Sequence, residues 1–187
     1  MSFKVFTSQD FKTTDWLGGR TTQFWISPVD ALLENRDFDF RISSAAVETS
    51  ESAFSKFEGY SRLLMVLEGE LQLVHEGHHS IVLKPFDQDA FLGSWDTRSI
   101  GLAKDFNVIY RNNLQADIDH RDVEAGSYLT LHDCQETFAF VLKGAGAIKG
   151  ESFKESDLIR IDQEQLISIH PDSDLQLIVV QLKNVDN

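Results

Sequence analysis

The chain has 187 residues, of which 42% are hydrophobic and 25% charged, the composition of an ordinary globular protein long enough to bury a core. Its formal net charge of -13 argues against nucleic acid as a partner, because phosphate recognition depends on clustered lysine and arginine. No apolar run approaches the ~20 residues that cross a bilayer, and the N-terminal residues lack the apolar region of a signal peptide. We therefore expect a cytoplasmic protein with no membrane partner.

The predicted elements of the first third of the chain are short strands. Residues 3–7 alternate weakly between apolar and polar side chains, and residues 21–27 are rich in β-branched and aromatic types before Pro28 ends the run. Residues 30–36 could form one or two helical turns, with Asp30 as the N-cap. The next predicted strand, residues 38–47, has a distinct pattern on each face.

Residues 38–47 place aromatic and aliphatic side chains on one face and small or polar ones on the other. Phe38, Phe40 and Ile42 share one parity, whereas Arg41 and Ser43 share the other with Ala45 and Val47. Two interpretations are open. The strand could lie between a core and a pocket, or it could have one solvated face, because both arrangements give this pattern.

The clearest supersecondary signal is a hairpin of two strands, residues 62–67 and 70–75. Gly69 supplies the positive φ that a short hairpin turn requires. Alternation puts Arg62 in line with the apolar residues Leu64 and Val66. Since an arginine is almost never fully buried unless paired, Arg62 is expected at the mouth of a cavity or facing an anion.

The rest of the chain is also predicted to be β, since no segment keeps a helical period of 3.6 residues. A strand over residues 80–86 precedes loops marked by Asp87, Asp89 and Gly93, and an acidic outer strand covers residues 116–124. The remaining predicted strands are short and lie at residues 106–110, 127–132, 137–142, 145–150, 157–162, 165–170 and 174–183.

An internal repeat indicates the architecture. Val66-Leu-Glu-Gly69 recurs as Val141-Leu-Lys-Gly144, each time between two predicted strands. We predict an all-β fold made of two tandem jelly-roll-like β-barrels, residues 1–112 with the candidate pocket and residues 113–187 as a degenerate copy. The hairpin resembles the conserved hairpin of cupins, so the chain is similar to a bicupin.

Metal-binding cupins supply histidine and glutamate ligands ahead of this hairpin glycine. In the first half Arg62 occupies the glutamate position, so we expect that barrel to be metal-free and the protein to need no cofactor. In the second half His132 and Cys134 only approximate the pattern, and we interpret them as a strand-end histidine and a structural thiol. His75, His78 and His79 are expected at a solvent-exposed hairpin tip, without a biological site.

Six short motifs occur in order between residues 16 and 107. They are W-x-G-G-x-T at 16–21, F-x-F-R-I-S-S-A at 38–45, F-S-x-F-x-G-Y-x-R at 54–62, L-E-G at 67–69, F-x-G at 91–93 and D-F-N at 105–107. Together they resemble the HutD/Ves family of bicupins. The chain departs from the usual family residues at Leu17, Glu58, Ser61 and Ser94, which affects ligand identity more than fold. The resemblance implies a role in histidine utilisation through a metabolite such as N-formylglutamate, or a stress-related role like that of Ves.

A carboxylate ligand suits the residues of the first half. Arg62 offers a planar fork for a carboxylate, and the other candidate ligand-binding residues are Arg41, Ser43 and Ser55 at the polar end and Trp16, Phe57 and Tyr60 at the apolar end. Asp105 is a further candidate. It could instead form a buried ion pair with Arg62, and in that case Arg62 would give no evidence of a ligand-binding pocket.

Two functional hypotheses follow. The first is a metal-independent binding or regulatory protein for a small acidic metabolite. The second is an isomerase or hydrolase with Tyr60 or His132 as acid or base, although no enzyme class transfers from the family. A homodimer through the apolar strand at residues 175–182 is possible, but an internal strand explains that run equally well.

Overall fold

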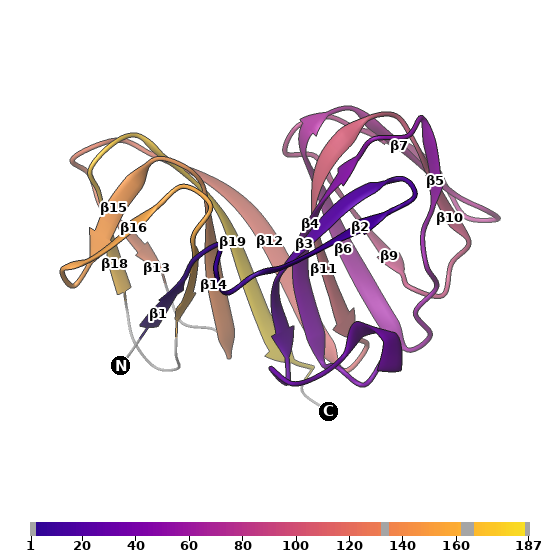
Figure 1. Ribbon diagram of the computed structural model, residues 1–187, viewed down its shortest axis with the longest axis horizontal. Coiled ribbons are helices and arrows are strands. Elements are labelled where there is room, and N and C mark those ends of the chain that lie inside the picture. Colours follow the sequence, from indigo (N-terminus) through magenta and orange to yellow (C-terminus); the bar gives the residue numbers. More distant parts are fainter. Residues whose placement is uncertain (1–2, 132–134, 162–166, 186–187) are drawn as a thin grey trace. The chain divides into compact units, whose positions relative to one another are not determined.

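The structure, a computed structural model, describes residues 3–131, 135–161 and 167–185, and nearly all of its regular structure is β (Figure 1). The chain forms two compact units, Phe11–Asn113 and Met1–Asp10 together with Leu114–Asn187. Each unit contains two antiparallel sheets with their own apolar cluster. Within the described residues, no helix is long and apolar enough to cross a membrane.

The unit Phe11–Asn113 has a six-stranded sheet of order β2-β3-β4-β11-β6-β9 and a four-stranded sheet of order β5-β10-β7-β8. The strands of the larger sheet are β2 (Lys12–Trp16), β3 (Gly19–Ser27), β4 (Phe40–Val47), β11 (Ala103–Arg111), β6 (Tyr60–Gly69) and β9 (Gln88–Leu92). Those of the smaller sheet are β5 (Glu51–Ala53), β10 (Thr97–Ile100), β7 (Leu71–His75) and β8 (Ser80–Leu83). A short 3-10 helix, η1 (Leu33–Asn35), follows β3.

The second unit has a five-stranded sheet of order β1-β17-β14-β19-β12 and four further strands in the order β13-β18-β15-β16. The five strands are β1 (Phe3–Phe6), β17 (Leu158–Ile161), β14 (Glu136–Lys143), β19 (Leu175–Asn184) and β12 (Leu114–Val123). The four are β13 (Leu129–Leu131), β18 (Ile167–Pro171), β15 (Ala145–Ile148) and β16 (Glu151–Lys154).

The two units repeat the same strand order, which confirms the prediction of two tandem jelly-roll-like halves. The run β4-β11-β6-β9 of the first unit matches β12-β19-β14-β17 of the second, and β5-β10-β7-β8 matches β13-β18-β15-β16. In each unit the hydrogen-bonded strands form separate sheets rather than one closed barrel. The sequence repeat therefore marks the same hairpin in both halves, β6-β7 and β14-β15.

The glycines of the repeat have the same structural role. Gly69 and Gly144 both have positive φ, 82° and 92°. A Cβ on Gly69 would lie 2.3 Å from the carbonyl oxygen of Leu102, and one on Gly144 would lie 2.4 Å from that of Asp174. Since Leu102 precedes β11 and Asp174 precedes β19, both hairpin turns press against the equivalent strand.

Gly69→Ala should therefore lower the free energy of unfolding by about 2 kcal/mol or more, from the left-handed conformation and the backbone clash together. The matched control is Gly59→Ala. Gly59 also has positive φ, 80°, but no atom lies within 4 Å of a Cβ there. Denaturant unfolding of both variants checks the prediction, and equal losses would contradict the close approach at Gly69.

Several elements differ from the sequence prediction. The segments of β2, β5, β9, β10 and β16 were not predicted as strands, because each is only three to five residues long. The helical turn at η1 is shorter than expected and begins after Leu32, which makes no side-chain cap bond, rather than at Asp30. The first ten residues belong to the second unit, because β1 pairs with β17 and Phe3 joins its core.

β19 is an internal strand with β14 and β12 as its two neighbours. Of the two readings of the apolar run at residues 175–182, the structure therefore supports the internal strand. Both sets of its backbone groups are already paired, so β19 is not a free edge for strand pairing with a second chain.

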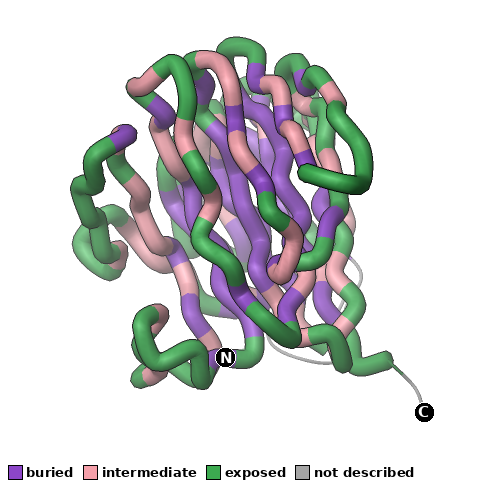
Figure 2. Tube along the Cα trace, turned by 90° about the vertical axis from the view of Figure 1, so that its right-hand side faces the viewer, coloured by how far each residue is buried: buried purple, intermediate pink, exposed green. Residues whose placement is uncertain are grey.

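The central strands β4, β6, β11 and β14 are buried on both faces over most of their length, whereas turns and connecting segments are largely exposed (Figure 2). In the first unit Leu64 and Val66 of β6 pack with Leu71 and Leu73 of β7 in a shared apolar cluster. The face of β6 that carries these residues also carries Arg62, as alternation predicts. Arg62 lies where this apolar packing ends and a cavity begins.

Candidate functional site

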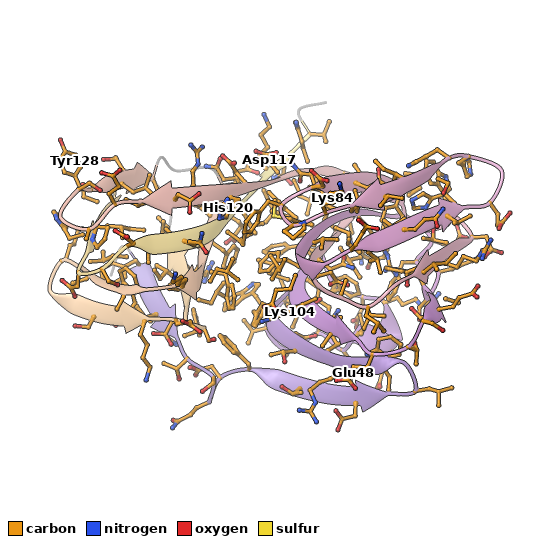
Figure 3. All side chains as sticks on the ribbon, turned by 90° about the horizontal axis from the view of Figure 1, so that it is seen from above. Glu48, Lys84, Lys104, Asp117, His120 and Tyr128 are labelled. Atoms are coloured by element: carbon orange, nitrogen blue, oxygen red, sulfur yellow. The ribbon has the colours of Figure 1, made fainter. Side chains whose placement is uncertain are left out.

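A cavity of about 420 Å³ lies within the unit Phe11–Asn113. Its walls come from one face of the six-stranded sheet and from the segments 31–33 and 52–57. The pleat decides which residues face it: on β11 the inward Asp105 lines the cavity. Its neighbour Lys104, labelled in Figure 3, is exposed and pairs with Glu68 at 3.5 Å. Arg41, Ser43, Ala45 and Val47 of β4 all line it, so that face is not solvated.

Arg62 is the most enclosed cation of the cavity, with a relative exposure of 4%. Its guanidinium carbon lies 5.3 Å from the ring centroid of Phe54, 5.0 Å from that of Phe57 and 5.9 Å from that of Phe91. Nη2 donates a hydrogen bond to the backbone carbonyl of Ser55. Burial lowers the pKa of Arg62 to about 10, so the side chain is still protonated at neutral pH.

Arg41 is a second buried cation beside the first. Its relative exposure is 8%, and burial lowers its pKa to about 10. Nε donates to Oε1 of Gln23 at 2.7 Å, and Nη1 donates to Oγ of Ser43 at 3.0 Å. These neutral partners hold the guanidinium in place without cancelling its charge.

Asp105 is the acidic residue of the cavity wall and is 2% exposed. Its Oδ1 accepts a hydrogen bond from the backbone N–H of Ala45 at 3.3 Å. Burial raises the pKa of Asp105 to about 7, against the opposing effects of that bond and of the two arginines. Among the described residues, no carboxylate oxygen lies within 4.0 Å of a nitrogen of Arg62 or Arg41, so Asp105 and Arg62 do not form the close ion pair considered above.

Two polar atoms of the cavity wall have no hydrogen-bond partner among the described residues. They are Nε of Arg62, a donor, and Oδ1 of Asn107, an acceptor, and both are shielded from solvent. A buried polar atom without a partner costs free energy. The wall therefore offers one donor and one acceptor to a molecule in the cavity.

Most of the residues predicted from the sequence do meet here. Arg62, Arg41, Ser43, Asp105, Ser55, Phe57 and Trp16 all line the cavity, Trp16 from its partly exposed end. Tyr60 does not, and its assignment to the apolar end was wrong. Its hydroxyl donates to the carbonyl oxygens of Arg36 at 2.9 Å and Phe38 at 2.7 Å, and its ring packs on Phe38 and Phe57 in a separate apolar cluster.

Further residues line the cavity wall that were not predicted from the sequence, among them Asn107, Phe54 and Gln23. Asn107 shares the parity of Asp105 within the D-F-N motif, and Phe54 begins the F-S-x-F motif, so both carried a readable signal. Gln23 had no such signal in the sequence. Its contact with Arg41 depends on a register shift between Gln23 and Trp25 in the pairing of β3 with β4. His132 and Cys134, considered above for a metal site, lie outside the described residues.

Comparisons with known proteins agree with this fold. The HutD family profile matches residues 8–179. An uncharacterized 21.2 kDa protein in the hutC 3' region of Pseudomonas putida is 34% identical over 113 residues. That match covers 57% of each chain, so this protein spans little more than half the length of the curated relative.

Solved structures show the same architecture. A conserved protein of unknown function from Pseudomonas aeruginosa PAO1 has a TM-score of 0.81 at 22% identity, covering 98% of this chain and all of that one. HutD from Pseudomonas fluorescens SBW25, in a formate condition, has a TM-score of 0.74 at 23% identity with the same coverage. The Escherichia coli pirin YhhW in complex with nickel(II) has a TM-score of 0.73 at 14% identity, covering 98% of this chain and all of that one.

The fold and the cavity thus define a two-unit protein of the cupin type, with a buried cationic pocket in its first unit. The profile match extends over most of the chain and includes all the strands that build the pocket. The chain belongs to the HutD family.

Cupin relatives raise the question of a metal ion in this cavity, and the wall residues do not fit one. Among the residues that the structure describes, no histidine lines the cavity, and Asp105 is the one carboxylate that does. Arg62 stands where the cupin pattern has glutamate, and two buried guanidiniums would repel a cation. The arrangement is suited to an anion.

Proposed function

We propose that this protein binds a small carboxylate metabolite in the first-unit cavity and acts as a binding or regulatory protein. Membership of the HutD family, with the likeness to a protein encoded beside hutC, supports a role associated with histidine utilisation. The observation that carries the proposal is the pair of buried arginines, Arg62 and Arg41, neither within ion-pair distance of a described carboxylate.

The wall indicates what the ligand contains besides a carboxylate. Carboxylate oxygens can accept from the open Nε of Arg62, in the planar geometry that arginine favours. An N–H or O–H group next to that carboxylate would satisfy Oδ1 of Asn107. The exposed Lys12 also lines the cavity and could pair with a second, outer carboxylate.

An N-acylated dicarboxylic amino acid such as N-formylglutamate has all three groups, because it carries an amide N–H between its acyl group and its carboxylates. The aromatic wall at Phe54 and Phe57 would contact the aliphatic part of such a molecule. The net charge of -13 opposes anion entry at long range. Attraction at the mouth and within the cavity therefore has to come from Lys12 and the two arginines.

Thermal unfolding with and without N-formylglutamate, each with and without a chelator, tests the proposal. At a ligand concentration 100 times its Kd, the free energy of unfolding should rise by ~2.7 kcal/mol, and the chelator should leave that rise unchanged. N-acetylglycinamide, which lacks a carboxylate, is the matched control and should give no rise. No stabilisation, or conversion of the ligand followed by NMR, would contradict the proposal of a binding protein.

A further inference from the structure

A second group of polar side chains lies in the first unit, away from the cavity wall. His75 is the last residue of β7, His79 precedes β8, and Asp89 lies in β9. None of the three lines the cavity. His78 and His79 lie exposed at the tip of the β7-β8 hairpin, as predicted, whereas His75 is buried and Asp89 lies in a strand rather than in the predicted loop. Strand β9 carries the carboxylate of Asp89 to the imidazoles.

The three side chains converge on a small volume. Nε2 of His75 lies 2.9 Å from Oδ2 of Asp89, and Nε2 of His79 lies 3.1 Å from the same oxygen. The candidate ligand atoms of all three residues lie within 4.8 Å of one another. Ligands about 2.0–2.2 Å from a common ion, as in zinc sites, are separated by distances of this size.

The surroundings hold this geometry in place. His75 is 2% exposed, and its Nδ1 lies 2.8 Å from Oγ1 of Thr97 in the paired strand β10. A hydrogen bond at the second ring nitrogen is the usual way in which proteins orient a metal-binding imidazole. The rings of Phe91 and Trp95 pack on the imidazole of His75, with distances between ring centroids of 4.6 and 5.4 Å, and shield it from solvent.

The protonation states are also suitable. Burial lowers the pKa of His75, so this imidazole is neutral at physiological pH and can offer a lone pair. If both rings are neutral, each must carry its proton on Nε2 in order to donate to Asp89. A metal ion bound at both Nε2 atoms would require each ring proton to be on Nδ1 instead, where that of His75 could be donated to Oγ1 of Thr97.

Access and charge favour a cation here. The side chain of His79 is 40% exposed and that of Asp89 is 12% exposed, so the group opens to solvent on one side. The negative charge of the protein, which opposes anions at the cavity, attracts cations at long range.

We propose that Nε2 of His75, Nε2 of His79 and a carboxylate oxygen of Asp89 form a binding site for a divalent transition metal ion of the Zn²⁺ or Ni²⁺ type. Two imidazoles and one carboxylate suit ions of this borderline class and leave a coordination position open to water or a small ligand. The site is separate from the cavity, so its occupation should not change binding of a carboxylate there.

The experiment is calorimetric titration of the tag-free, metal-stripped full chain with Zn²⁺ at pH 7.5. We expect one ion per chain, and a more than about 10-fold weaker affinity for His79→Ala and for Asp89→Asn. The matched control is His78→Ala. His78 lies between the ligands in sequence but stacks on Trp95 at 3.8 Å, outside the group, and its removal should leave the affinity within about threefold.

NMR of the histidine side-chain nitrogens adds a readout that identifies the ligands. Zn²⁺ should shift Nε2 of His75 and His79 and leave the His78 ring nitrogens in place. No binding by the wild-type chain, equal affinity of His79→Ala, or equal weakening by His78→Ala would overturn the site. Since the His79 side chain is partly exposed, His79→Ala is expected to fold even if Asp89→Asn does not.

Discussion

Arg62→Met should weaken binding of the carboxylate ligand by about 2–5 kcal/mol, a factor of at least ~30. The guanidinium is the buried charge that the ligand neutralises, and methionine has a similar length but cannot pair with an anion. Stability should respond differently. Arg62 is enclosed by three phenylalanine rings, and no carboxylate of the described part of the chain lies within 4.0 Å of its nitrogens. An apolar side chain should therefore leave the free energy of unfolding unchanged or raise it.

Titration calorimetry and denaturant unfolding of the same variant separate these two effects. Arg98→Met is the matched control, because Arg98 makes exposed ion pairs with Glu51 and Glu76, and it should bind the ligand as the wild-type chain does. Arg62→Lys should be intermediate, because lysine keeps the charge and loses the planar fork. Unchanged binding by Arg62→Met would exclude the cavity as the carboxylate site.

Asp105→Asn should stabilise the protein above pH 7 by as much as about 4 kcal/mol. Burial raises the pKa of Asp105 from 3.8 to about 7, and each pKa unit corresponds to about 1.36 kcal/mol. Between these two values the folded chain keeps a proton that the unfolded chain has lost. The free energy of unfolding of the wild-type protein therefore falls as the pH rises from about 4 to 7, whereas that of the asparagine variant does not fall for this reason.

The measurement is the difference in unfolding free energy between Asp105→Asn and wild type across the pH range 4 to 9. The difference should be small at pH 4, grow to pH 7 and then stay constant. Asparagine can still accept the hydrogen bond from the Ala45 N–H through its carbonyl oxygen, so that contact is preserved. Asp96→Asn, at an exposed surface ion pair, is the control and should give a difference that stays near zero. A flat profile for Asp105→Asn would show that the carboxyl does not titrate near pH 7.

The sequence was informative where alternation and turn chemistry decide the structure. The parity of Arg62 with Leu64 and Val66 and the positive φ of Gly69 were both readable, and the repeat of that glycine revealed the second unit. Tyr60 shares the parity of Arg62, yet it lies beyond the cavity. Alternation gives the face of a strand but not how far along that face a cavity extends.

The group at His75 shows a different limit. Its third member lies on β9, a strand of only five residues that was not predicted, and the group exists only because that strand pairs with β6. Gln23 was hidden for a similar reason, since its contact with Arg41 depends on the irregular pairing of β3 and β4. Contacts that depend on strand order and register cannot be read from one segment at a time.

The presence of one acid and two cations in the wall also makes the cavity sensitive to the net charge of its ligand. With Asp105 ionised, the three buried side chains sum to one positive charge and balance a monoanion; with Asp105 protonated, they sum to two and balance a dianion. Near neutral pH a ligand that places both of its negative charges beside these three side chains should therefore bind with uptake of a proton by Asp105, whereas a ligand that places one charge there should not.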